Sequence, residues 1–182
     1  MNISQKYQEI MQALERGDRY QKPLTSEESE IVLQKLQQTQ NLSSNELDWV
    51  LCIAINTATF ISNIEASLIS ILRTNKNNST LVYALNCSRK QIIAAQFRQG
   101  RRLSPDFLDT LMLLLEHQDP EIVEWTLRTI EECGSQAIYF RAKLKTIRPS
   151  IFKLFNRHQR AILELTEYLE RKWSGYEKTG PK

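Results

Sequence analysis

Glycine and proline are scarce in this sequence, and most of them lie where a helix would begin or end. Only five of each occur among 182 residues, less than half the usual share. Gly17 and Gly134 follow segments with helical apolar periodicity, as left-handed helix caps do. Pro105 and Pro120 each stand between a capping residue and an acid, which is typical of a first helical turn. The sequence therefore predicts helices joined by short loops.

Capping boxes mark further helix starts. Serine or threonine followed three residues later by glutamate occurs at residues 25–28, 43–46 and 62–65, and this pattern satisfies two amides that a helix leaves unpaired. We predict about nine helices and an all-α fold, with short loops that make successive helices antiparallel neighbours. The predicted helices cover residues 2–16, 26–40, 44–60, 63–75, 79–98, 105–117, 120–133, 136–147 and 151–173.

The predicted organisation has three parts: an N-terminal helix with a linker (1–24), a single helical domain (25–173) and a polar, disordered tail (174–182). The helix over 44–60 is apolar nearly all round, which indicates packing on several sides. The last helix is amphipathic, with Phe155 and His158 on its apolar stripe. We expect Phe155 in the core and His158 as a hydrogen-bonded or partly exposed core residue.

Two segments of the sequence repeat one pattern. Residues 68–85 align with residues 111–127, and each is an apolar helix, a short polar turn and a second helix. Ala84 and Thr126 occupy the same place, where a small side chain lets paired helices approach closely. Within residues 111–134, the L-x-x-L-L run, the segment Asp119–Val123 and the pair Thr126-Leu127 resemble one HEAT-type repeat, a unit of roughly 40 residues with two antiparallel helices.

The resemblance implies antiparallel hairpins stacked into a short, right-handed α–α superhelix. It also implies a non-enzymatic scaffold or adaptor that binds a protein or peptide on the surface of the helical repeats. Two positions depart from the family pattern. Glu124 occupies a position where the family usually has arginine, and in the upstream copy the position equivalent to Asp119 is Lys76. An irregular helical bundle with a single HEAT-like hairpin is the alternative architecture.

Charge is distributed unevenly along the chain. Residues 86–102 and 136–160 carry basic residues and no acid, whereas residues 103–135 are predominantly acidic. A bipolar surface of this kind steers charged partners, and solvated helix faces are the alternative interpretation. The surface residues that we predict to contact a protein partner are Glu121, Glu124, Arg128, Arg141, Lys145 and Arg148.

Aromatic residues interleaved with basic ones suggest a second function, the binding of DNA or RNA. Cations bind phosphates and rings stack on bases, and Phe97, Tyr139, Phe140 and Phe152 lie among arginines and lysines. HEAT-like DNA glycosylases that act in alkylation repair bind DNA on a basic concave face, although no motif here resembles their catalytic residues. The residues of this alternative surface are Arg98, Arg101, Arg102, Lys153, Arg157 and Arg160.

The sequence lacks the motifs of an enzyme. Phosphate-binding loops and nucleophile turns are absent, no cluster has metal-ligand spacing, and a dyad of Cys133 with His117 or His158 is outweighed by a core role for the thiol. We therefore predict no catalytic residue, cofactor or metal. Three unpaired cysteines, no signal-peptide core and no apolar stretch long enough to cross a bilayer favour the cytoplasm and no membrane partner.

Overall fold

Four helices begin at the capping residues that the sequence predicts, Thr25, Ser43, Ser104 and Asp119. α2 (Ser26–Gln37) and α3 (Ser44–Asn56) each start with a complete capping box. At α2, the Thr25 hydroxyl accepts a hydrogen bond from the Glu28 amide at 3.1 Å, and the Glu28 carboxylate accepts one from the Thr25 amide at 2.9 Å. Each box thus satisfies two amides that have no partner within the helix.

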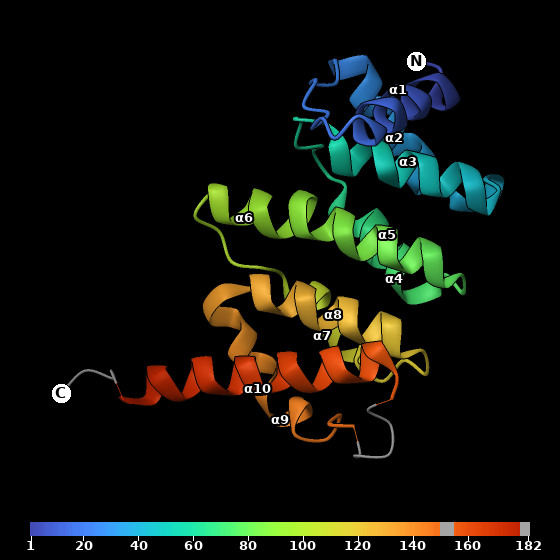
Figure 1. Cartoon of the computed structure of the whole chain (residues 1–182). Coiled ribbons are helices and arrows are strands. Elements are labelled where there is room, and N and C mark those ends of the chain that lie inside the picture. Colours follow the sequence, from blue (N-terminus) through green and yellow to red (C-terminus); the bar gives the residue numbers. More distant parts are fainter. Residues whose placement is uncertain (150–154, 179–182) are drawn as a thin grey trace. The chain divides into compact units, whose positions relative to one another are not determined.

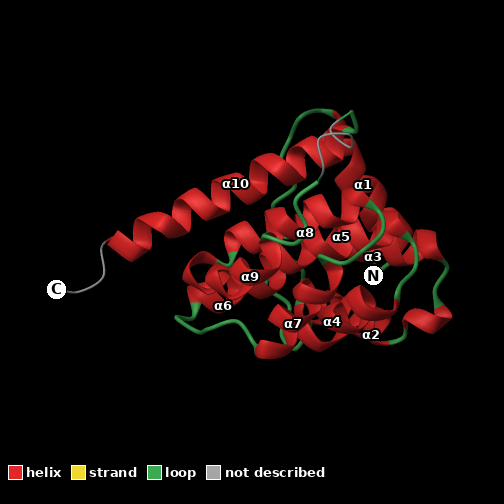
Figure 2. Cartoon of the chain, turned by 90° about the horizontal axis from the view of Figure 1, so that it is seen from below, coloured by secondary structure: helices red, strands yellow, loops and turns green. Residues whose placement is uncertain are grey.

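The computed structural model describes residues 1–149 and 155–178, and every regular element in this part of the chain is helical (Figures 1 and 2). This confirms the predicted all-α class. The chain divides into two compact units, residues 1–102 and residues 103–182. The sequence-based prediction had instead placed one undivided domain over residues 25–173.

In unit 1, residues 1–102, α3 is the central helix. It packs against α1, α2 and α5, and α5 also packs against α4. The predicted burial of α3 on several sides is confirmed, since Leu47 and every residue from Val50 to Ala54 are buried. The other elements of unit 1 are α1 (Ile3–Glu15), a 3-10 turn (Thr39–Asn41), α4 (Glu65–Thr74), α5 (Asn78–Ser88), a π-helical segment (Arg89–Ala94) and α6 (Ala95–Arg98).

The helix predicted over 44–60 ends at Asn56 because the residues after it bond to other parts of unit 1. The Thr57 hydroxyl donates to the Lys22 carbonyl at 3.2 Å, and the Thr59 hydroxyl accepts from the Leu24 amide at 2.8 Å. These bonds tie the loop after α3 to the linker between α1 and α2. The linker thus belongs to the packed unit.

The π-helical segment directs two successive side chains at the C-terminal end of α3. The Gln91 amide donates to the carbonyls of Ala54 and Thr59 at 2.7 and 3.0 Å and accepts from the Ile61 amide at 2.9 Å. Three carbonyls accept hydrogen bonds from the Lys90 ammonium, those of Ala54, Ile55 and Thr57. Lys90, part of the basic run over 86–102, therefore caps α3.

In unit 2, residues 103–182, α8 is the central helix. It packs against α7, α10 and the 3-10 segment Gly134–Phe140, as the yellow, orange and red helices of Figure 1 show. Ser104 and Asp119 cap α7 and α8, and proline follows each cap as predicted. The α-helices of unit 2 are α7 (Pro105–Leu114), α8 (Pro120–Glu132), α9 (Arg141–Leu144) and α10 (Arg157–Lys178).

Three local predictions in unit 2 differ from the structure. The helix predicted over 136–147 is the 3-10 segment Gly134–Phe140 followed by the short α9. Phe155 lies in the turn before α10 and is 93% exposed, so its prediction as a core residue is wrong. The last helix continues to Lys178, beyond the predicted start of the tail at 174. Residues 150–154 and 179–182, to which the helix start at Ser150 and the end of the tail belong, lie outside the described residues.

The capping box predicted at residues 62–65 is not formed. α4 begins at Glu65 with Ile64 as its N-cap, and no side chain caps it. Asn63 has a φ of 61°, the left-handed conformation that asparagine tolerates better than most residues. The turn at Asn63 separates Ser62 from the helix, and this prediction is therefore wrong.

Each of the two aligned segments contains a helical hairpin. α4 packs on α5 in unit 1, and α7 packs on α8 in unit 2. Ala84 and Thr126 are both fully buried, as their place in the alignment requires. The hairpins lie in different units, and their stacking into a superhelix stays a prediction.

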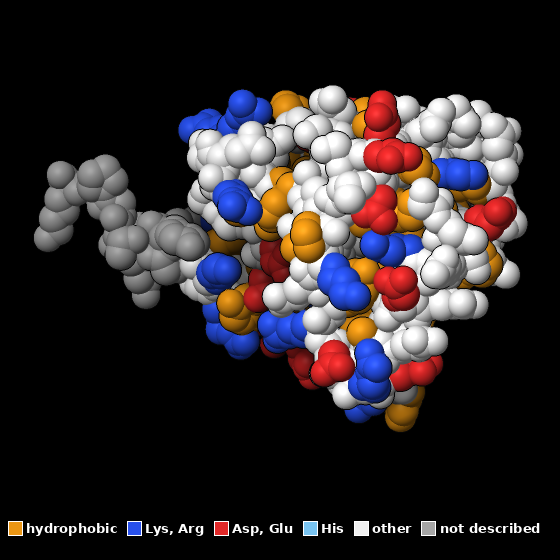
Figure 3. All heavy atoms as spheres, turned by 90° about the horizontal axis from the view of Figure 1, so that it is seen from above, with side chains coloured by type: hydrophobic (Ala, Val, Ile, Leu, Met, Phe, Trp, Pro, Cys, Tyr) orange, Lys and Arg blue, Asp and Glu red, His pale blue; other side chains and the backbone are white. Residues whose placement is uncertain are grey.

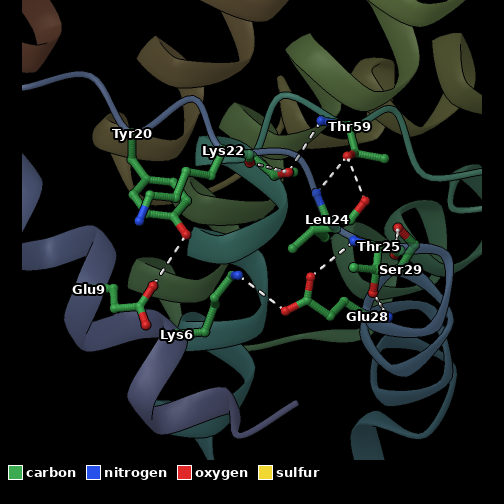
Figure 4. A network of polar contacts seen from close by, with 10 residues as sticks. Lys6, Glu9, Tyr20, Lys22, Leu24, Thr25, Glu28, Ser29 and Thr59 are labelled. Carbon is green, nitrogen blue, oxygen red and sulfur yellow. Dashed lines mark hydrogen bonds and ion pairs between the residues drawn. The ribbon is translucent and has the colours of Figure 1, made fainter.

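Polar contacts connect α1, the linker and the start of α2 (Figure 4). The Lys6 ammonium lies 3.1 Å from the Glu28 carboxylate, and the Tyr20 hydroxyl donates to Glu9 at 3.4 Å. The hydrogen bond from the Thr25 amide and the charge of Lys6 hold the pKa of Glu28 below its ordinary value. The folded state therefore favours the Glu28 carboxylate over the protonated acid.

We predict that Glu28→Gln removes a contribution to the free energy of unfolding that depends on pH. The wild-type carboxylate stabilises the fold above its ordinary pKa, and this contribution disappears as the pH falls through the lowered pKa. Glutamine retains the capping bond but not the charge, so the difference should be below about 1 kcal/mol at neutral pH and vanish in acid. Urea unfolding across this pH range measures it. Glu27→Gln, at an exposed neighbour, is the control, and an equal pH-dependent loss with that substitution would contradict the prediction.

Candidate functional site

Glu124, one of the predicted partner contacts, holds unit 2 together. Its Oε1 accepts hydrogen bonds from the Arg128 guanidinium, from Nε at 2.9 Å and from Nη2 at 2.7 Å. Its Oε2 lies 2.7 Å from Nδ1 of His158, near the start of α10. With 9% of its surface exposed, Glu124 joins α8 to α10, so its prediction as a surface residue is wrong.

The His158 ring lies between the Glu124 carboxylate and the Arg157 guanidinium. Nδ1 faces Glu124, and Nε2 accepts a hydrogen bond from Nε of Arg157 at 3.2 Å. This geometry places the ring proton on Nδ1. The expectation that His158 is a hydrogen-bonded, partly buried residue is confirmed. The ring has no free nitrogen for a ligand or for acid–base chemistry.

Other acids of unit 2 pair with its basic segment. Lys143 forms an ion pair with Glu116, and the Tyr139 hydroxyl donates to Asp109 at 2.7 Å. The hydrogen bond to Asp109 raises the pKa of Tyr139. Arg148, another predicted contact, pairs with Glu170 of α10. Part of the charge separation seen along the sequence is thus compensated inside unit 2.

The remaining predicted contacts differ in exposure. Lys145 is exposed directly after α9, and Arg128 is exposed with its guanidinium 5.8 Å from the centre of the Trp125 ring. Glu121 and Arg141 are half-buried, and Arg141 is engaged in interactions of its own. The six residues therefore do not form one open charged surface.

Unit 2 also exposes apolar side chains that are not among the predicted contact residues. Leu113 is 60% exposed, Tyr139 51% and Ile138 48%. Leu113 lies one turn after Asp109 on α7 and three residues before Glu116 in the turn that follows the helix, and these acids contact Tyr139 and Lys143. We give the name α7–η3 face to these three exposed residues of α7 and of η3, the 3-10 segment Gly134–Phe140. In the sequence, the continuous apolar run 111–115 gave no sign of which leucine points outward.

Three residues of the alternative nucleic-acid surface gather at the end of α6. Arg98, Arg101 and Arg102 are all exposed around Gly100, whose φ of 66° lets the chain turn after the helix. The Arg98 guanidinium lies 5.4 Å from the centre of the Phe60 ring. We call this group the arginine turn.

The other three residues of that surface belong to unit 2. Arg157 contacts His158, Arg160 is exposed on α10, and Lys153 lies outside the described residues. The sequence-predicted set is therefore divided between two units.

The thiols are held in an unreactive form. Burial raises the pKa of Cys87 and of Cys133 to about 12, and that of Cys52 to about 11. Cys133 Sγ donates to the Thr129 carbonyl at 3.5 Å, and His117 Nδ1 accepts from the Asp119 amide. A nucleophilic thiol needs a lowered pKa or a nearby base, which this geometry does not provide for Cys133.

The chain was also compared with known proteins. No family model matches it, and neither a curated protein nor a solved structure does. Among the described residues, no group of three side chains could hold a metal ion, and no helix has the length and apolar character that crossing a bilayer requires. The described residues define an all-α protein made of two helical units.

We predict that Glu124→Ala destabilises the protein by about 2 kcal/mol, because it leaves His158 and Arg128 without their shared acceptor. Urea unfolding followed by fluorescence measures this, since Trp125 and Trp173 report on unit 2. Glu131→Ala, on the same helix, should change stability by less than about 0.5 kcal/mol. Equal effects of the two substitutions would show that the Glu124 contacts add nothing.

Proposed function

We propose that this protein is a non-enzymatic interaction module, a scaffold or adaptor that binds another protein on an exposed helical surface. The observation that carries the proposal is the α7–η3 face, where Leu113, Ile138 and Tyr139 are each about half exposed or more. Contiguous apolar groups at the surface of a folded unit mark interaction sites. Tyrosine is enriched in such sites because it combines an apolar ring with a polar end.

The contacts that flank this face give it a fixed geometry. The Tyr139 ring is held by Asp109, and Lys143 is held by Glu116. Fully burying one leucine contributes about 2 kcal/mol, and tenfold in affinity corresponds to about 1.4 kcal/mol. A partner that covers Leu113 would thus gain substantial affinity, while the rim charges would affect its approach.

The hairpins α4–α5 and α7–α8 support a HEAT-like helical-repeat architecture for this module. Repeats of this kind use extended helical surfaces for binding. Three buried, unpaired thiols are in keeping with a reducing compartment, the cytoplasm.

We predict that Leu113→Asp abolishes partner binding, because a carboxylate on the apolar face loses its water when the partner covers it. Affinity capture from extract of the source cells, with quantitative mass spectrometry, measures the bound protein. Leu14→Asp is the matched control, since Leu14 is an exposed leucine of unit 1. Recovery of the partner should fall at least about tenfold only for Leu113→Asp. Equal recovery with both variants would refute the α7–η3 face as the site.

The arginine turn supports nucleic-acid binding as a second candidate. Phe97 is 43% exposed beside three exposed arginines, and the Phe60 ring lies under Arg98. Arginine and aromatic side chains together bind single strands through phosphate contacts and stacking.

This second candidate predicts that a labelled single strand binds with an affinity that falls steeply with salt. Each phosphate contact contributes about 0.7 to the slope of log affinity against log salt. Replacing both Arg101 and Arg102 by glutamate should remove that slope, whereas Lys76→Glu, a single charge reversal at another exposed site of unit 1, should leave most of it. An absence of binding at about 50 mM salt would exclude this candidate.

A further inference from the structure

One serine of this chain lies between two features by which protein kinases select their substrates. Ser104 has Arg101 at the third position before it, Arg102 at the second, and Pro105 directly after it. No other serine or threonine in the sequence is followed by proline. Kinases discriminate between substrates by charge patterns of this kind. A cleft that offers no acceptor to the next backbone amide also favours proline, because proline has no N–H to leave unpaired.

The residues that a kinase would read lie outside the helices. Residues 101–104 form the segment between α6 and α7. Arg101 and Arg102 are exposed, and Figure 3, which looks onto unit 1, shows basic side chains on the side where α6 ends in Figure 1. The Ser104 backbone is extended, with a φ of −69° and a ψ of 146°, as is favoured directly before proline. An extended segment is the form in which a cleft binds a peptide through its backbone.

A second serine with arginine at the third position before it differs from Ser104 in both respects. Ser174 follows Arg171, but it lies within α10, and its hydroxyl donates to the Arg171 carbonyl at 2.8 Å. Glycine comes after it in place of proline. The helix would have to unfold before a cleft could bind this segment in an extended form. Ser174 therefore serves as the internal comparison for Ser104.

Contacts within unit 2 restrain the segment around Ser104. The side-chain amide of Gln136 accepts a hydrogen bond from the Leu103 amide at 2.9 Å and donates one to the Leu103 carbonyl at 3.4 Å. The Leu103 side chain is only 3% exposed, and the Ser104 hydroxyl accepts a hydrogen bond from the Phe107 amide at 3.2 Å. A kinase must displace Leu103 before it can bind. The rate of modification therefore depends on how readily this segment leaves Gln136.

The geometry points to Ser104 as a phosphorylation site for a serine kinase that reads Arg101 and Pro105, with Gln136 restraining its access. In the transfer, the Ser104 oxygen bonds to the γ-phosphorus of ATP, the bond from that phosphorus to the β-phosphate oxygen breaks, and ADP leaves with the electron pair. The hydroxyl proton goes to the catalytic aspartate of the kinase. The phosphate adds a charge of about −1.5 to −2 shortly after the two arginines. This site does not rest on the proposed function.

The test uses the full chain, ATP and a purified serine kinase whose peptide selectivity requires arginine at the third position before the serine and proline directly after it. Mass spectrometry of the digested protein should place the phosphate on Ser104. Arg101→Ala and Pro105→Ala should each lower the initial rate at least about tenfold. Gln136→Ala should raise the rate about fivefold, because it removes both hydrogen bonds that hold Leu103.

Gln118→Ala is the matched control for Gln136→Ala, because Gln118 is an exposed glutamine in the loop after α7; its rate should equal that of the wild type. Thermal melts establish that each variant is folded. No phosphate on Ser104, equal rates for wild type and Arg101→Ala, or modification of Ser174 as fast as that of Ser104 would overturn the site. Equal rates for Gln136→Ala and Gln118→Ala would overturn the restraint by Gln136.

Discussion

Unpaired backbone groups at helix ends are the constraint on which unit 1 depends. The last carbonyls of α3 have no partner within their helix, and they lie in the interior beside the loop that follows. Lys90 and Gln91 satisfy them together, which requires two successive side chains to face the same end of α3. A regular α-helix separates successive side chains by about 100°. Both residues lie in the π-helical segment Arg89–Ala94, and such segments are frequent at functional sites in proteins.

The same constraint explains which parts of the fold could be predicted from the sequence. At Thr25, Ser43, Ser104 and Asp119 the capping side chain and the amide that it satisfies lie within three residues of each other, so a short pattern contains the whole interaction. Ser62 carries the same pattern but starts no helix, because the left-handed turn at Asn63 intervenes. The C-terminal end of α3 was placed too late since its partners lie more than 30 residues away in the sequence.

The charged residues show the same limit. Glu124 and His158 are 34 residues apart, and Glu116 and Lys143 are 27 apart. The sequence contains two neighbouring segments of opposite charge. Because both segments belong to one compact unit, some of their charged side chains pair with each other. Glu124, which was predicted to face a partner, instead joins α8 to α10, and Glu116 pairs with Lys143 of α9. Exposure was equally hard to predict, since Leu113 and Leu114 are identical in the sequence and differ only in the side of α7 they occupy.

Internal pairing of charge changes which residues are left for recognition. An ion pair already satisfied within a unit gives a partner little, because the partner would have to break it or add to it at a cost in desolvation. Apolar side chains that remain exposed carry no such cost, and covering them releases water. Among the described residues, the large apolar side chains that stay exposed are Leu113, Ile138, Tyr139, Phe155 and Tyr168 in unit 2 and Leu14 and Phe97 in unit 1. The partner binding that we propose should therefore depend on apolar contacts more than on charge pairs.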